Sequence, residues 1–162
     1  MEYKLDGIRL FSKLSQDEMK ELSDLLTEFT YEPGEFIFKE GEDSHSFHII
    51  TSGTVEVFSS FNQNQDVEII KIGSGNTVGE VGFIDGKERT ASVKCITPTT
   101  TLCLSKKIFT SIIESNSLLA MKILKEIGII LSERLRWCDK ILVSDREMRV
   151  SSRFMDAIES SV

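Results

Sequence analysis

The sequence contains few of the residues that mark several common protein classes. Its 162 residues include three cysteines, two histidines and two prolines. An odd number of cysteines without a CxxC spacing argues against a disulfide framework or a zinc knuckle, so we interpret Cys95, Cys103 and Cys138 as small buried apolar residues. His45 and His48 lie in a strand-like run that points them to opposite faces, with no third ligand nearby. No metal site is therefore predicted.

Long apolar runs and an excess of positive charge are also missing. The formal net charge of −7 argues against non-specific binding to nucleic acid or to anionic membranes. No apolar run approaches the length of a membrane-spanning helix, and the first ten residues lack a signal-peptide core. We therefore expect a cytoplasmic protein with no membrane segment and no nucleic-acid partner. The length fits a single domain that buries a real core.

A helical pattern is present near the start of the chain. Ser15 and Glu18 have the spacing of a capping box. Apolar residues then follow at steps of three and four, namely Met19, Leu22, Leu25, Leu26 and Phe29. We expect an amphipathic helix that ends before Tyr31, preceded by a short helical turn around Phe11 and Leu14.

From Pro33 to Cys103 the pattern changes to short apolar runs separated by turn residues, which is typical of an all-β sandwich or barrel. Six runs are predicted to be strands, namely EFIFKEG, SFHIITSG, TVEVFSSF, DVEIIKIGSG, TASVKCITP and TTLCLSKK. The segment VGEVGFIDG is too rich in glycine and too short for a full strand. We interpret it as an insertion between strands that serves a ligand.

The periodicity after Lys106 is helical and contains two apolar stripes. One stripe holds Leu124, Ile127, Leu131, Leu135, Cys138 and Leu142, and the other holds Ile123, Ile130, Trp137 and Ile141. A helix on a single core needs one stripe, so the second indicates a partner surface, and a homodimer through this helix is the simplest candidate. The alternative is one broad stripe packed on the chain's own β structure. We assign residues 1–143 to the domain and 144–162 to a polar tail that continues the helix or folds back, with fraying as the default.

Glycine is concentrated in one stretch, where Gly73, Gly75, Gly79, Gly82 and Gly86 make up half of the ten glycines. Glycine permits positive φ angles and close approach to the backbone, so the stretch indicates a place where main chain meets a ligand.

The chemistry of that ligand follows from the residues around the glycines. A short helix beginning near Gly79 would leave N–H groups without intrahelical partners on Val81, Gly82 and Phe83, and such groups bind anions. Arg89 could close the site as a bidentate clamp on phosphate, while Glu80 would accept hydrogen bonds from sugar hydroxyls. Together these features predict a nucleotide pocket.

Several short motifs, taken in order, resemble the cyclic nucleotide-binding domain family over roughly Leu10 to Leu142. They are Pro33-Gly34-Glu35, Lys39-Glu40-Gly41, Ser52-Gly53, Gly79-Glu80 and Arg89-Thr90-Ala91-Ser92-Val93. The resemblance implies a mainly β fold with flanking helices (α+β), an eight-stranded β-roll with an N-terminal helix and a long C-terminal helix. It also implies that cAMP or cGMP binds as a ligand, with no cofactor.

The resemblance assigns roles to individual residues of the glycine-rich stretch. In that family the acid of the GE pair receives the ribose 2′-hydroxyl and the arginine of the RxAxV run holds the cyclic phosphate, which places these roles on Glu80 and Arg89. Main-chain N–H groups complete the cradle. The ligand-binding set implied is Gly79, Glu80, Val81, Gly82, Arg89, Thr90 and Ala91. Three positions depart from the family, since Val78 replaces a common aromatic residue, Gly82 a common alanine and Glu88 a common proline.

Thr90 bears on the choice between cAMP and cGMP. Members that prefer cGMP often carry threonine directly after the arginine, where its hydroxyl can meet the guanine amino group. Because a neutral hydrogen bond contributes only about 0.5–1.5 kcal/mol, Thr90 biases the choice without deciding it.

The function expected from these observations is a regulatory module that repositions its C-terminal helices when a cyclic nucleotide binds. The alternative is a structural or partner-binding dimerisation module whose nucleotide pocket is unused. An enzyme is not expected and no catalytic residue is assigned, because the sequence offers no positioned nucleophile, general base or metal-ligand set.

Overall fold

Two antiparallel sheets of four strands each make up the β structure, in a computed structural model that describes the backbone of residues 7–62 and 65–159 and the side chains of residues 7–59 and 69–143. One sheet has the order β1 (Thr27–Tyr31), β8 (Thr99–Ser105), β3 (Ser46–Ser52) and β6 (Thr77–Val78). The other has the order β2 (Phe36–Phe38), β7 (Ser92–Cys95), β4 (Thr54–Asn62) and β5 (Gln65–Gly73). The predicted β-roll with flanking helices is confirmed.

Each of the six predicted apolar runs contains a strand, but β1 and β6 were not predicted. The strand β6 is only two residues long, and its pairing with β3 at His48↔Val78 and Ile49↔Thr77 defines it. Such a short strand has no periodicity of its own, so only its partner reveals it.

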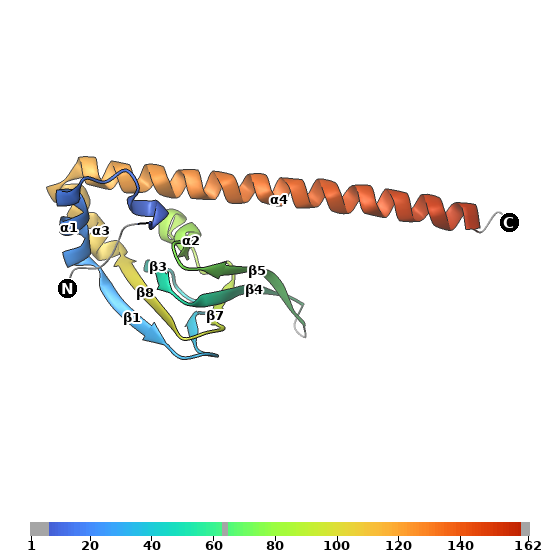
Figure 1. The fold of residues 1–162 in the computed structure, drawn as a ribbon, viewed down its shortest axis with the longest axis horizontal. Helices are drawn as coiled ribbons and strands as arrows, with labels where there is room; N and C mark the ends of the chain where they lie inside the picture. The colour runs from blue at the N-terminus through green and yellow to red at the C-terminus, as the bar shows by residue number, and fades with distance from the viewer. Residues whose placement is uncertain (1–6, 63–64, 160–162) are drawn as a thin grey trace. The chain divides into compact units, whose positions relative to one another are not determined.

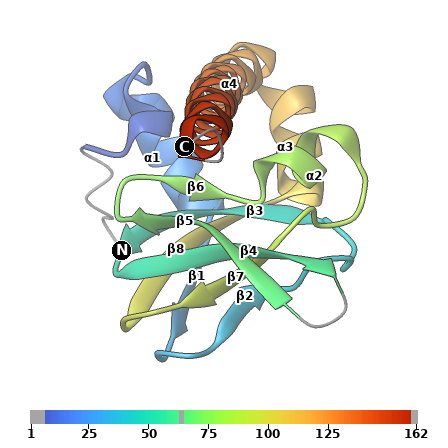
Figure 2. The same cartoon turned by 90° about the vertical axis from the view of Figure 1, so that its right-hand side faces the viewer.

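The helices are the 3-10 turn η1 (Arg9–Phe11), α1 (Gln16–Leu25), α2 (Glu80–Asp85), α3 (Lys106–Ser115) and α4 (Ser117–Glu159). In both views α1, α2 and α3 lie on the same side of the two sheets (Figure 1, Figure 2). The predicted turn around Phe11 is present as η1, whereas Leu14 lies beyond its end.

The predicted N-terminal helix starts correctly and ends too late. Its capping box is present, with the Ser15 N–H donating to Glu18 Oε2 over 2.8 Å and the Glu18 N–H donating to Ser15 Oγ over 3.2 Å. The helix α1 ends at Leu25, however, and Phe29 lies in β1 opposite Thr101 of β8. The segment TEFTY is rich in β-branched and aromatic residues, and pairing with β8 outweighs the helical spacing of its apolar residues.

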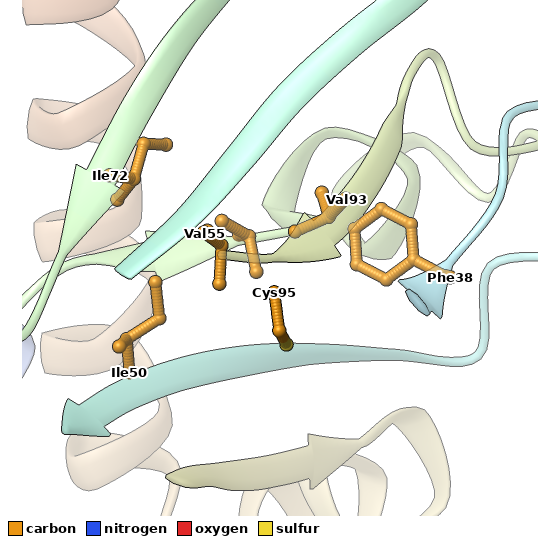
Figure 3. Packing of buried hydrophobic residues seen from close by; sticks show 7 residues of the cluster. Phe38, Ile50, Val55, Ile72, Val93 and Cys95 are labelled. Atoms are coloured by element: carbon orange, nitrogen blue, oxygen red, sulfur yellow. The ribbon is translucent and has the colours of Figure 1, made fainter. Parts of the chain in front are cut away.

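The core of the roll lies between the two sheets. Figure 3 shows side chains from both sheets pointing toward one another. The buried cluster consists of Phe38, Ile50, Val55, Ile72, Val78, Val93 and Cys95. Strand β3 is buried on both of its faces, because Phe47, His48, Ile49 and Ile50 are all less than 9% exposed. Cys95 and Cys103 are buried as predicted.

The helix α4 continues through the predicted tail as far as Glu159, so continuation of the helix, and not fraying, is what the structure shows. The chain divides into two units, one ending at Ile127 and one starting at Gly128. The predicted domain boundary at residue 143 stays a prediction.

Burial along α4 differs from the predicted stripes. In the first unit, Ile127 is buried together with Ile123, although it was assigned to the stripe of Leu124, which is 40% exposed. In the second unit, Cys138 is exposed, so its interpretation as a buried residue was wrong. Its place in a stripe of exposed leucines explains the difference.

Candidate functional site

The glycine-rich stretch forms a short helix between two left-handed glycines, here called the cassette (residues 77–92). Gly79 is the N-cap of α2 with φ 85°, and Gly86 is its C-cap with φ 78°. Both conformations are rare for residues with a side chain, which explains glycine at these positions. The prediction that a short helix interrupts the strands is therefore confirmed.

Glu80, the first residue of α2, is buried with 1% exposure. Val81 points to solvent, and Gly82 is buried against Ser44, whose atoms a Cβ on Gly82 would meet at 2.7 Å. The prediction that the Phe83 N–H lacks an intrahelical partner was wrong, because this group donates to the Gly79 carbonyl over 3.3 Å.

Arg89 lies folded into the protein and is only 6% exposed. Its Nη1 donates to the Gly79 carbonyl oxygen over 2.9 Å, and its Nη2 donates to Ser46 Oγ over 3.4 Å. Its Cζ stands 3.9 Å from the ring centroid of Phe38. Its Nε is buried and has no hydrogen-bond acceptor among the residues that the structure describes. The guanidinium thus donates these two hydrogen bonds to neutral acceptors and keeps donor capacity for a ligand.

The backbone of Arg89 is fixed by the turn between β2 and β3. The Arg89 N–H donates to the Glu42 carbonyl over 2.8 Å, and the Arg89 carbonyl accepts from the Gly41 N–H over 2.9 Å. A third hydrogen bond joins the same turn to the start of β7, where the Glu40 N–H donates to Ser92 Oγ over 3.0 Å. The position of the arginine is therefore set by main-chain hydrogen bonds of both its N–H and its carbonyl group.

The electrostatics of the site favour an anion. Burial lowers the pKa of the Arg89 guanidinium, because desolvation disfavours the charged form, while Cys103, Glu42 and Glu80 act in the opposite direction. Arginine nonetheless stays protonated in proteins. A buried positive charge is costly unless an opposite charge compensates it, so an anionic ligand oxygen would stabilise this arrangement.

The remaining predicted site residues lie at the exposed side of the cassette. Thr90 is exposed and Ala91 is half-buried, directly before β7. The structure therefore brings the seven predicted residues together in one segment, with Glu80 and Arg89 buried and Val81 and Thr90 at the surface.

A model of the cyclic nucleotide-binding domain matches residues 28–116, more than half of the chain. The chain belongs to this family. A cGMP-dependent protein kinase from Caenorhabditis briggsae is 27% identical over 111 residues, which cover 67% of this chain and 15% of the kinase. This domain thus spans a small part of the length of that curated relative.

Solved structures agree with the family. A cyclic nucleotide-binding domain from Methylobacillus flagellatus is 27% identical to this chain with a TM-score of 0.78, covering 85% of this chain and 78% of that one. A regulatory subunit of a cAMP-independent protein kinase A from Trypanosoma cruzi, bound to guanosine, is 26% identical with a TM-score of 0.64 and covers 75% of this chain and 42% of that one.

Four side chains of this cyclic nucleotide-binding domain support the cassette without having been predicted, namely Phe38, Ser44, Ser46 and Lys106. Lys106 Nζ, at the start of α3, donates to the Gly82 carbonyl over 3.1 Å and so links α2 to α3. The sequence carries one usable signal, since the alternation in EFIFKEG puts Phe36 and Phe38 on one face. It does not say that Arg89 lies on that face.

Within the residues that the structure describes, no cluster of three or more His, Cys, Asp and Glu could hold a metal ion. The same residues include no helix with the length and apolar character needed to cross a membrane.

Proposed function

We propose that this domain binds cAMP or cGMP in the cassette and acts as a regulatory module, not as an enzyme. The observation that carries the proposal is the pair of oppositely charged, buried side chains Glu80 and Arg89, which are 1% and 6% exposed. The family resemblance implies the ribose contact for Glu80 and the phosphate contact for Arg89. A cyclic nucleotide offers both a hydroxyl and an anionic diester. It therefore matches this pair better than an inorganic anion or an uncharged sugar.

The roles follow from the chemistry of each group. Arg89 binds the cyclic phosphate with the donors that neutral groups leave available, and Glu80 accepts a hydrogen bond from the ribose 2′-hydroxyl. Gly79 has no side chain, so the backbone at this position can approach the ligand closely. The main-chain N–H groups of Val81, Gly82, Thr90 and Ala91 supply further donors around the phosphate.

Ligand binding shifts the helices that follow the β-roll. The proposed route is the hydrogen bond from Lys106 Nζ to the Gly82 carbonyl, because it joins the last turn of α2 to the first residue of α3. A ligand that contracts the cassette changes the position of that carbonyl. The equilibrium between the two helix positions shifts only by the difference in the binding free energy of the ligand for them. A ligand with equal affinity for both positions does not shift the helices.

A homodimer through α4 is part of the proposal. Within the second unit, Leu131, Leu135, Cys138 and Leu142 follow one another at steps of four, three and four, and Leu135 and Leu142 are 64% and 67% exposed. This is the spacing of a coiled-coil seam, which a second copy of the same helix would cover. In a parallel pair the two Cys138 side chains face each other, so mild oxidation should crosslink the dimer, and Leu135→Asp should abolish the crosslink.

Calorimetric titration of the full chain tests the binding proposal. The ligands are cAMP, cGMP and guanosine, and the proteins are the wild type, Arg89→Ala and the control Lys87→Ala, which removes an exposed cation from the same loop. Arg89→Ala is expected to weaken binding of the cyclic nucleotide by about 2–5 kcal/mol, because the buried charge pair between the guanidinium and the cyclic phosphate is lost. Lys87→Ala should leave the affinity within about twofold.

Guanosine distinguishes phosphate recognition from base recognition. It has no phosphate, so its affinity should not depend on Arg89. If guanosine binds and neither cyclic nucleotide does, the pocket reads nucleosides and the proposed ligand is wrong. If no ligand gives heat or a melting shift at millimolar concentration while the Cys138 crosslink forms, the alternative of a dimerisation module with an unused pocket is correct.

A further inference from the structure

The ring of Phe38 supports the guanidinium of Arg89. Arg89 Cζ lies 3.9 Å above the ring centroid, well within the range of a cation–π contact. Both partners are buried, with Phe38 8% and Arg89 6% exposed. Water therefore screens the contact weakly, and contacts of this kind are strongest when desolvated.

Other side chains pack around the Phe38 ring. Figure 3 shows Phe38 among the side chains of the core, on the side of Val93 and Cys95. The imidazole of His48 lies 6.3 Å from the Phe38 ring, centroid to centroid, and it is fixed by a hydrogen bond of 3.1 Å between Nδ1 and Thr101 Oγ1. The ring of Phe29 lies 6.0 Å from that of His48, centroid to centroid. Phe29, His48 and Phe38 thus form a series of tilted ring contacts, and the guanidinium lies over the Phe38 ring.

The imidazole of His48 carries no charge that would compete with Arg89. Burial, and secondly the charge of Arg89, lower the pKa of His48 to about 4, so its imidazole is neutral at physiological pH. The guanidinium therefore meets no like charge on His48, while the charges of Glu42 and Glu80 act favourably on it.

Gly79 lies against both Phe38 and Arg89. A Cβ at Gly79 would overlap Arg89 Nη1 and would lie 3.0 and 3.1 Å from Phe38 Cε1 and Cζ. The guanidinium therefore contacts both an aromatic face and the Gly79 backbone, whose carbonyl accepts its Nη1 hydrogen bond. Few other orientations are open to it.

We propose that Phe38 is a positioning residue, which orients the guanidinium of Arg89 so that it meets a cyclic phosphate without prior rearrangement. The inference rests on the proposed function and adds a residue to it. An arginine side chain has a large rotamer entropy, and a site that has already restricted it loses less on binding. Phe38 does not touch the ligand in this proposal and acts through Arg89 alone.

The test replaces Phe38 by mono-, di- and trifluorinated phenylalanine, which keep the shape of the ring and progressively weaken its cation–π attraction. Affinity for cAMP and cGMP is measured by calorimetry in the full chain. The expected result is a graded loss that reaches about two- to thirtyfold for the trifluorinated ring. The same substitutions at Phe11, which is 2% exposed and lies in η1, should leave the affinity unchanged.

A second readout reports the orientation directly. The Arg89 Nε–H resonance should carry a ring-current shift in the wild type, and Phe38→Leu should remove it. A flat affinity series, or tighter binding as fluorine is added, would overturn the inference while leaving the proposed function intact. If the unmodified protein binds no cyclic nucleotide, the proposed function fails, and the inference fails with it.

Discussion

The side chain of Arg89 occupies the space that a side chain on Gly79 would need. A Cβ on Gly79 would overlap Arg89 Nη1, while the Gly79 carbonyl accepts a hydrogen bond of 2.9 Å from that same nitrogen. Gly79 also has a φ of 85°. Any larger residue here therefore meets two separate obstacles, one in its backbone conformation and one in the position of the arginine.

These two obstacles can be separated by comparing Gly79→Ala with Gly86→Ala. Both glycines have positive φ, so both substitutions should destabilise the fold by about 1–2 kcal/mol. A Cβ on Gly86 meets only Lys106 Nζ, at 4.0 Å, so Gly86→Ala should bind cyclic nucleotide almost normally. Gly79→Ala should lose at least about tenfold in affinity as well, because it displaces Arg89. Urea unfolding and calorimetry measure the two effects, and equal affinities for the two variants would contradict the account.

Glu80 should be tested with a ligand that lacks its partner group. A hydrogen bond to a charged acceptor contributes about 1.5–3 kcal/mol, so Glu80→Gln should weaken cAMP binding by up to that amount. The wild type should bind 2′-deoxy-cAMP more weakly than cAMP by a similar amount, and Glu80→Gln should discriminate much less between them. Glu88→Gln is the control, because Glu88 is exposed in the same loop. Additive losses in Glu80→Gln would show that Glu80 does not contact the 2′-hydroxyl.

The buried imidazole of His48 predicts a pH dependence of stability. Its pKa is lowered from 6.5 to about 4 in the folded state, so between these values the unfolded chain binds more protons. The stability is fully present above pH 6.5 and is lost as the pH falls toward 4, by about 3 kcal/mol in total.

Denaturant unfolding between pH 7 and about pH 5 checks this dependence, since most carboxylates titrate below that range. His48→Gln should flatten the slope of the unfolding free energy against pH. His45→Gln is the matched control, because the His45 side chain is 81% exposed, and it should keep the wild-type slope. A wild-type slope in His48→Gln would assign the dependence to other groups.

The sequence predicted the binding segment better than its surroundings. The signals for this segment are local, namely the glycines Gly79 and Gly86, the acid Glu80 and the arginine Arg89. Backbone turns and charged groups in an apolar setting can be recognised from a few neighbouring residues. The strand β1 has no such local signal, since Leu25, Leu26 and Phe29 also fit a helix. The pairing of β1 with β8 determines that the segment is a strand.

The support of Arg89 could not be predicted for a related reason. Phe38, Ser46 and Glu42 reach it from β2, β3 and the turn between them, which are far from Arg89 in the sequence. Only the closure of the two sheets places them around one guanidinium. Contacts of this kind depend on which distant residues the fold brings together, and no local pattern in a single sequence shows this.

The ion pair of Lys122 with Glu18 joins α4 to α1 within the first unit. Lys122 Nζ lies 2.7 Å from Glu18 Oε1, and this contact, more than any other, lowers the pKa of Glu18. Because the Lys122 side chain is 32% exposed, Lys122→Met should destabilise the fold by no more than about 1 kcal/mol.

The depressed pKa of Glu18 gives this prediction a pH signature. Glu18 contributes stability above its ordinary pKa of 4.5, and this is lost as the pH falls below that value. The difference in unfolding free energy between wild type and Lys122→Met should therefore shrink in acid. Lys125→Met removes an exposed lysine from the same helix and should change stability by less than about 0.5 kcal/mol at any pH. A difference that persists unchanged in acid would argue against the ion pair.

The turn between β2 and β3 places a limit on how this chain can vary. Gly41 and Glu42 hold the peptide of Arg89 from both sides, so the register of the turn determines where the arginine stands. Substitutions on the exposed side chains of the turn would leave those main-chain bonds intact. An insertion or deletion of a single residue would move the carbonyl and the N–H that Arg89 uses. This loop can therefore change its sequence during evolution but must keep its length.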